Sequence, residues 1–384
     1  TAFFTYKIAI KVSTLKIAFW SAIFCVFFQS LFGSMQGVMS EHISMVFFMP
    51  ALYLLIKYNK WYWVALAGIL MGLTCMVKLN MAYPIAFIGL YQLYNYYKNG
   101  ALRKGIYNSL FYGFGILLVI FLTILPYYLK GTPEIWWNSV IEAPLVYASS
   151  RRSSIFSFAP LVLILLLFLY VSKRKKYLNF NNPDIQISIV VTITVILSFI
   201  KGGRINGHYL IQLYPILLIL IGIVLGKLSF PKNIYLKPLC ILMLLLIPLE
   251  SYLEYTSIFK NKVDKGTFFN GEGIEIPHYL IENNIDTSNI FFSEYHIGYW
   301  YLNAKPPTKA THPSNVYKSE LYPFFNNPRT TALEEITFIL EDLEPQIIVR
   351  RKGSLILDKK LIDENIYVNE YLNQNYKVLT SIGK

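Results

Sequence analysis

The sequence predicts an α-helical polytopic membrane protein with about nine spans in residues 1–252, followed by a small extracytoplasmic α/β domain in residues 253–384. Composition is the first reason. Of 384 residues, 55% are hydrophobic and 15% are charged, against roughly 45–50% and 25% in soluble proteins. Charge distribution is the second reason, because residues 1–250 hold 21 Lys and Arg but 5 Asp and Glu, whereas residues 251–384 hold 14 and 17. The basic residues lie in short clusters between apolar runs, as membrane topology requires, so no nucleic-acid partner is expected.

Long apolar runs give the individual spans. A helix needs about 20 apolar residues to cross the hydrocarbon layer with its backbone groups paired internally. The junction at Asn80–Pro84 leaves a re-entrant break open as an alternative to a simple loop. The predicted spans are 17–34, 41–57, 61–79, 81–97, 106–129, 155–172, 185–201, 208–226 and 234–252.

The loops between these spans predict an orientation, because loops rich in Lys and Arg stay in the cytoplasm. One set of alternate loops carries fifteen cations and the other carries six. An odd number of spans then places the tail on the poorer, outer side, which predicts a bacterial inner (plasma) membrane protein with its carboxy-terminal domain outside. The richer set is Lys7, Lys11, Lys16, Lys57, Lys60, Lys98, Arg103, Lys104, 173–176, Lys227, Lys232 and Lys237.

Short strands and helices alternate in the tail, which predicts a small α/β domain. The expected strands are Asn289–Phe292 and Gln346–Arg350, with a further strand at Tyr376–Ile382. The expected helices are Pro277–Asn283, Thr331–Leu343 and Leu361–Leu372.

Glu41 is the only acidic residue among the first 130 and lies at the outer start of the second span. A carboxylate at a membrane boundary is costly unless it is solvated or paired. In one interpretation Ser40 caps the helix and Glu41 favours the positive end of the helix dipole. In the other, Glu41 orients a sugar or an acceptor, or assists proton transfer, at the outer interface.

Cations on the outer face also need an explanation, because topology disfavours them there. Gathered in the fold, they would hold the phosphate of a lipid-linked donor, since guanidinium and ammonium groups suit phosphate oxygens. The alternative is that each one extends to lipid head groups. The candidates are Lys78, Arg151, Arg152, Lys201 and Arg204.

His208 and Tyr209 open the eighth span after a glycine-rich loop at 201–207. The glycine spacing is not that of a nucleotide-binding fingerprint, and the loop follows a membrane span. We predict that His208 is functional, while Tyr209 belongs either to the site or to the aromatic belt of the membrane interface. The absence of HExxH, CxxC, Walker and GxSxG patterns gives no support to metalloprotease, redox, NTPase or serine-hydrolase readings.

Four stretches carry a resemblance to a known family. They are Ser40–Glu41, Gly68–Leu73 leading to Lys78, His208–Leu210 with Leu213–Pro215, and Gly298–Tyr301 through Lys305–Thr308. In this order the chain resembles membrane glycosyltransferases of the GT-C type. Within that type it is most similar to the family 39-like group, which includes dolichyl-phosphate-mannose protein mannosyltransferases and lipid A aminoarabinose transferases.

The resemblance implies inverting transfer of a sugar from a polyprenyl-phosphate donor in the bilayer to a lipid, glycan or protein acceptor at the outer face. A divalent metal is left open, and no other cofactor is expected. In such enzymes the main acidic residue lies in the first outer loop, whereas Glu41 looks like their second boundary acid. Lys78, Arg204 and His208 are weaker matches to the donor-phosphate region.

The chain opens on Thr1 and shows no cleavage site of a signal peptide. We therefore expect a fragment that lacks the first-loop catalytic Asp and is inactive by itself. Two alternative functions stay open. A transporter of an anionic solute would want ionisable groups near mid-membrane and broken helices in paired halves. A membrane polysaccharide polymerase or ligase would want a large outer loop between late spans.

Overall fold

The computed structural model describes residues 1–30, 38–150, 154–203, 207–228, 249–268, 271–309, 319–325 and 328–383, with the single residues 242 and 246. The chain divides into two compact units. One comprises Thr1–Trp136 and Arg151–Glu254, and the other Trp137–Ser150 and Tyr255–Lys384. The predicted boundary followed residue 252, so the grouping of residues 137–150 with the second unit was not predicted.

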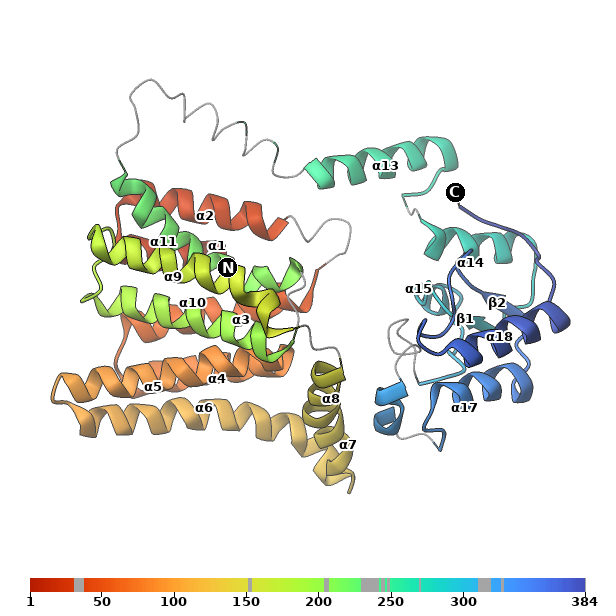
Figure 1. The fold of residues 1–384 in the computed structure, drawn as a ribbon, viewed down its shortest axis with the longest axis horizontal. Helices are drawn as coiled ribbons and strands as arrows, with labels where there is room; N and C mark the ends of the chain where they lie inside the picture. Colours follow the sequence, from red (N-terminus) through yellow and green to blue (C-terminus); the bar gives the residue numbers. More distant parts are fainter. Residues whose placement is uncertain are drawn as a thin grey trace. The chain divides into compact units, whose positions relative to one another are not determined.

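The first unit is a bundle of helices, many of which run side by side (Figure 1). Eight of the predicted spans coincide with helices, with ends shifted by up to six residues, while the ninth, 234–252, lies mostly outside the described residues. The helices are α1 (Ala2–Val12), α2 (Leu15–Ser30), α3 (Ser40–Lys57), α4 (Trp61–Val77), α5 (Ala82–Lys98), α6 (Leu102–Leu129), α7 (Pro133–Trp137), α9 (Ala159–Arg174), α10 (Pro183–Lys201) and α11 (Tyr214–Lys227). Short 3-10 segments join them at η1 (Leu79–Met81), η3 (Ile155–Phe158) and η4 (Gly207–Gln212).

Helix α1 was not predicted, because two lysines interrupt its apolar pattern. Its residues Ile8 and Ala9 are fully buried, and it packs against α2 and α3. Lys7 therefore lies within a helix and not in a loop. Lys11 reaches the far end of α3, where its Nζ donates to the carbonyl of Ile56 at 2.8 Å and lies 3.5 Å from Asp184 at the start of α10.

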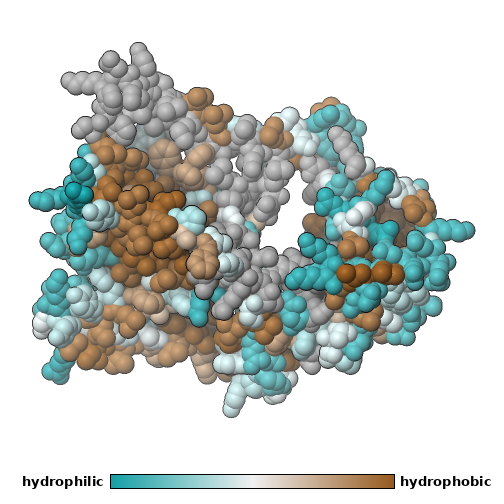
Figure 2. Space-filling model, viewed as in Figure 1, coloured by the Kyte–Doolittle hydropathy of each residue, from teal (hydrophilic) through white to brown (hydrophobic). Residues whose placement is uncertain are grey.

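Three helices of the described chain are long and apolar enough to cross a membrane: α6, the stretch Phe156–Arg174, and α10. Most of α10 is buried, whereas most of the other two faces outward. On α6 the exposed side chains Leu110, Phe114, Leu117 and Phe121 share one helix face. Figure 2 shows this apolar character as a broad hydrophobic surface over the middle of the unit.

Hydrophilic side chains gather at one end of this unit, where α5 meets α6 and α9 meets α10 (Figures 1 and 2). Exposed cations of the predicted cytoplasmic set lie here. They are Lys98, Arg103, Lys104 and residues 173–176. We call this end of the first unit the basic end.

Glycines allow α4 and α6 to pack closely. A Cβ atom on Gly68 would lie 2.3 Å from the carbonyl oxygen of Tyr112, and one on Gly115 would lie 2.4 Å from that of Ala65. These contacts are with backbone atoms, which cannot move aside unless the helices separate. The pattern is typical of helices that associate through small residues.

The second unit contains a two-stranded parallel sheet of β1 (Ile290–Phe292) and β2 (Ile347–Val349), with Ile290 opposite Ile347. Its described helical segments are η2 (Asn138–Glu142), α8 (Ala143–Ser150), α14 (Glu272–Glu282), α15 (Ile297–Tyr301), η5 (Ser319–Phe325), α17 (Ala332–Thr337), η6 (Phe338–Asp342) and α18 (Ile362–Asn375), with most of α13 (Leu249–Lys265). The predicted strands at Asn289–Phe292 and Gln346–Arg350 and the three predicted helices thus occur, with shifted ends.

The predicted strand at Tyr376–Ile382 is wrong. Residues 376–383 pair with neither strand of the sheet, and Val378 and Leu379 are exposed. Apolar residues in a short stretch are not enough to form a strand, because a strand also needs a partner for its backbone hydrogen bonds, and this stretch pairs with neither β1 nor β2.

Helix α17 begins with a capping box, in which the backbone N–H groups of Thr330 and Thr331 hold the pKa of Glu334 below its usual value.

Candidate functional site

Glu41 lies in the first turn of α3 with its side chain only 1% exposed. The expected Ser40 cap is absent, because the Ser40 hydroxyl donates to Glu41 Oε2 at 3.3 Å. His42 takes that role instead. Its Nδ1 accepts from the backbone N–H of Met39 at 3.1 Å, so the ring proton is on Nε2, which donates to the Gln29 carbonyl at 3.1 Å.

Lys78 supplies the counter-charge for Glu41. It follows the last residue of α4, where the backbone turns to an extended conformation and η1 begins. Its Nζ lies 2.6 Å from Glu41 Oε1, and its side chain is 26% exposed. The break in the helix frees the Lys78 side chain to cross to α3, where about a quarter of it remains exposed.

His208 and Tyr209 approach the same pair from η4. His208 Nε2 lies 3.9 Å from Glu41 Oε1, and its side chain is 29% exposed. The Lys78 ammonium lies over the Tyr209 ring at 5.3 Å from its centroid, a cation–π contact. Tyr209 in turn stacks on Phe199 of α10 with 6.0 Å between ring centroids. We call Glu41, Lys78, His208 and Tyr209 the Glu41 cluster.

The cluster lies at the end of the unit opposite the basic end. Glu41 begins α3 and Lys78 follows α4, whereas Lys57 ends α3 and Lys60 precedes α4. Chain direction alone therefore separates the cluster from the basic end by the length of a helix.

The two charged side chains of the ion pair differ in burial. A buried carboxylate is stable only when it is paired, so loss of Lys78 would destabilise Glu41 more than loss of Glu41 would destabilise Lys78. Glu41 Oε1 is close to Lys78, but the angles do not make a hydrogen bond, and within the described residues this oxygen accepts none. The lysine ammonium has three N–H donors, and Glu41 engages one side of it. The partly exposed side can bind an anionic group.

Four of the eight candidate residues thus come together, namely the Glu41 cluster itself. Lys201 is exposed at the end of α10 and makes no ion pair with any described acid. Arg151, Arg152 and Arg204 lie outside the described residues.

Sequence reasoning missed two residues beside the cluster. Asn80 Nδ2 donates to Gln212 Oε1 at 2.8 Å, and Gln212 Nε2 donates back to Asn80 Oδ1 at 3.3 Å. Gln212 is fully buried. A buried amide in an apolar span was the available signal, because such a group needs a hydrogen-bond partner.

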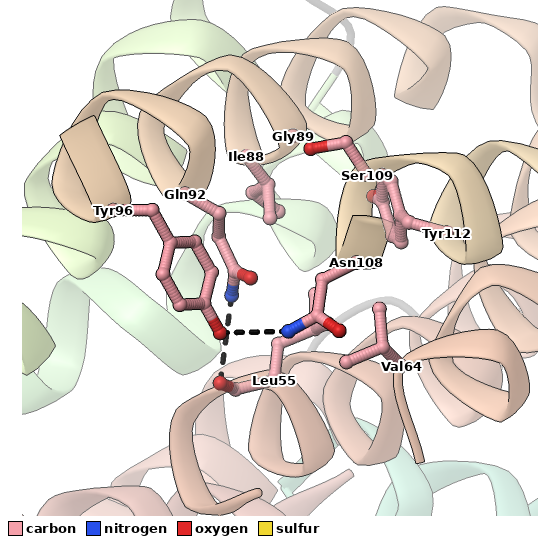
Figure 3. Close-up of a pocket in the computed structure, with 9 residues that line it drawn as sticks. All are labelled: Leu55, Val64, Ile88, Gly89, Gln92, Tyr96, Asn108, Ser109 and Tyr112. Carbon is pink, nitrogen blue, oxygen red and sulfur yellow. Dashed lines mark hydrogen bonds between the residues drawn. The ribbon is translucent and has the colours of Figure 1, made fainter. Parts of the chain in front are cut away.

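A second polar group lies between α3, α4, α5 and α6 near the basic end (Figure 3). Asn108 Nδ2 donates to the Tyr96 hydroxyl at 2.8 Å, and Gln92 Nε2 donates to the Leu55 carbonyl at 3.4 Å. The cavity they line, with a volume of about 10 Å³, holds one water at most. The polar side chains around the cavity are paired with one another or with the backbone, and the cavity is too small for a substrate.

No group of three His, Cys, Asp or Glu side chains in the described ranges is arranged to hold a metal ion. The Glu41 cluster offers one carboxylate and one imidazole, and Lys78 already occupies the carboxylate.

No protein-family model matches the chain, and no curated protein or solved structure matches it significantly. The chemistry of the Glu41 cluster is therefore the basis for inferring a function. In this cluster a buried acid and an aromatic ring hold a partly exposed cation, with a partly exposed imidazole beside them.

Proposed function

We propose that the protein transfers a sugar from a polyprenyl-phosphate-linked donor to a lipid, glycan or protein acceptor at the outer face of a membrane. The observation that carries this proposal is the Glu41–Lys78 ion pair with the adjoining His208 and Tyr209 side chains. The ammonium group of Lys78 is held by Glu41 on a partly exposed side chain. Such a group is suited to bind a phosphate that leaves with negative charge.

The membrane setting supports the proposal. Apolar side chains cover the outward faces of α6 and α9, which water would not tolerate but lipid tails would. We propose that the predicted spans cross the bacterial inner membrane with the basic end in the cytoplasm and the tail outside. The Glu41 cluster would then lie at the outer interface, where the phosphate of a polyprenyl donor resides.

Burial gives Glu41 a different part from a general base. With 1% of its side chain exposed and Lys78 2.6 Å away, Glu41 is better placed to hold a cation than to take a proton from an acceptor hydroxyl. We propose that Glu41 orients Lys78 and His208, and that Lys78 binds the donor phosphate. In this proposal the partly exposed imidazole of His208 is the member of the cluster that can accept a proton.

Sugar transfer by the protein in membranes supplied with polyprenyl-phosphate sugars tests this proposal. Lys78→Met should lower kcat/KM by about 100-fold or more, because a charged contact to the leaving phosphate is lost in the transition state. Glu41→Gln should lower it less, since the lysine stays. Lys130→Met and Glu134→Gln are matched controls, because both residues are exposed beyond the same end of the bundle. Unchanged transfer in Lys78→Met would refute the donor-phosphate role.

A transporter of an anionic solute is a second candidate, and one observation favours it. Lys78 lies where α4 breaks into η1 beside a buried acid, and broken helices with buried charges are typical of transporters. Uptake of a labelled anion into sealed vesicles, lost in Lys78→Met and present without any acceptor, would favour transport over sugar transfer.

A further inference from the structure

The amide pair Asn80–Gln212 joins the two segments that carry the Glu41 cluster. Asn80 is the middle residue of η1, two positions after Lys78. Gln212 is the last residue of η4, which also contains His208 and Tyr209. The two hydrogen bonds, at 2.8 and 3.3 Å, therefore connect a residue two positions after Lys78 with a residue four positions after His208.

The same part of the chain also meets η4 where the ammonium of Lys78, the residue before η1, lies over the Tyr209 ring. A lysine side chain has four rotatable bonds, so its ion pair and ring contact do little to fix the backbone that carries it. Two reciprocal amide hydrogen bonds are directional, and together they restrict both backbones more than a lysine side chain does. The amide pair is thus a more rigid contact between the two segments than the lysine side chain.

Satisfying a buried polar group is the simplest purpose of such a pair, but it does not account for its position. Gln212 is fully buried, whereas Asn80 is partly exposed and could be hydrated without a partner. Neither amide hydrogen-bonds to Glu41, Lys78 or His208. Any effect of the amide pair on the cluster must therefore pass through the alignment of η1 and η4.

We propose that Asn80 and Gln212 are positioning residues that align Lys78 and His208 on the same oxygen of Glu41. The consequence for sugar transfer rests on the proposed function, but the alignment itself does not. Loss of the pair should loosen η1 from η4 and release the Lys78 ammonium into water.

The reactivity of Lys78 tests the alignment without any substrate. The full chain in detergent is treated briefly with an amine-reactive reagent, and mass spectrometry gives the labelling of Lys78 relative to exposed Lys130. Gln212→Met removes the amide at nearly constant volume, and Asn80→Ala removes the other half. Each should raise the Lys78 to Lys130 ratio about fivefold, the equilibrium equivalent of one hydrogen bond.

An exchange variant, Asn80→Gln with Gln212→Asn, keeps a reciprocal amide pair and should restore the ratio to within about twofold of the parent. Asn99→Ala is the control, because its amide bonds only locally to Asn95 at the basic end. An unchanged ratio in a folded Gln212→Met chain, or an exchange variant that behaves like the single variants, would overturn the positioning role. A Gln212→Met chain that fails to fold would assign the pair to folding alone and overturn it as well.

The same variants separate this inference from the proposed function. If the protein transfers sugar, the single variants should lower kcat with little change in KM, and the exchange variant should recover it. If it transfers none, the labelling ratios still decide whether the pair aligns Lys78.

Discussion

Glu41 carries a negative charge where water is nearly excluded, and its neighbours follow from that fact. A carboxylate in such a place requires a cation, and Lys78 provides one at 2.6 Å with His208 at 3.9 Å. The exposed fractions, 1% for Glu41 and 26% for Lys78, make the pair asymmetric. Without its partner, the lysine can extend into water, whereas the glutamate cannot.

This asymmetry predicts unequal costs for removing each charge. Lys78→Met should destabilise the protein by about 3–5 kcal/mol, because it leaves a buried charge unpaired. Glu41→Gln should cost about 1–2 kcal/mol, because Lys78 is then hydrated. Thermal unfolding can be followed with a fluorogenic maleimide, since Cys25 and Cys75 are buried free thiols that react when the fold opens.

The double variant Glu41→Gln with Lys78→Met is the control for additivity. It should be more stable than Lys78→Met alone, because no unpaired charge remains. Equal costs for the two single variants would contradict the burial argument.

At the scale of helices, breaks and close packing place the cluster. Helix α4 ends before Lys78, and η4 carries His208 and Tyr209 to the same end of the bundle. Phe199 of α10 stacks on Tyr209 and so fixes its ring from a third element. The close approach of α4 to α6 at Gly68 and Gly115 holds the other face of α4.

Two glycines in α6 should respond oppositely to alanine. A Cβ at Gly115 would meet backbone atoms at 2.4 to 2.8 Å, so Gly115→Ala should destabilise the protein by about 1–3 kcal/mol. A Cβ at Gly113 meets nothing within 4 Å, so Gly113→Ala should gain up to about 1 kcal/mol of helix propensity. The same thiol-reaction melting curves measure both, and a lower melting temperature for Gly113→Ala than for Gly115→Ala would refute the packing.

At the scale of the molecule, two compact units of different character share one chain. The first exposes apolar helix faces, and the second encloses a parallel sheet within a mostly polar surface (Figure 2). Residues 137–150 belong to the second unit although they precede α9 in sequence. The second unit is therefore assembled from two separate stretches of chain.

The proposed orientation predicts which residues a membrane-impermeant maleimide can reach. In a chain whose own cysteines are replaced by serine, Val378→Cys should react in intact spheroplasts, because the tail lies outside. Lys175→Cys should react only after the membrane is opened, because it lies at the basic end. Both positions are exposed, so access to the reagent differs only by side. The reverse pattern would invert the orientation and move the Glu41 cluster to the cytoplasmic face.

Several features followed from the sequence because they depend on local properties. Apolar runs predicted eight helices near their observed places, and the strands around Phe291 and Ile348 followed from short apolar runs beside turns. Prediction failed where the apolar pattern was interrupted or where strand formation depended on a partner elsewhere in the chain. Helix α1 was missed because of its lysines, and the strand at Tyr376–Ile382 was predicted although these residues pair with neither β1 nor β2.

The sequence by itself determined where helices form and that polar groups such as Glu41, Lys78 and His208 require an explanation, because hydrophobicity and charge are read residue by residue. Only the tertiary structure decided that Lys78 and His208 approach the same carboxylate oxygen of Glu41. It also decided that His42 replaces Ser40 as the cap and that Asn80 pairs with Gln212. Such contacts depend on how closely helices approach and where they break. The glycines of α4 and α6 and the turn at η1 set that geometry. The preferences of single residues do not predict it, because it depends on contacts between residues far apart in the sequence.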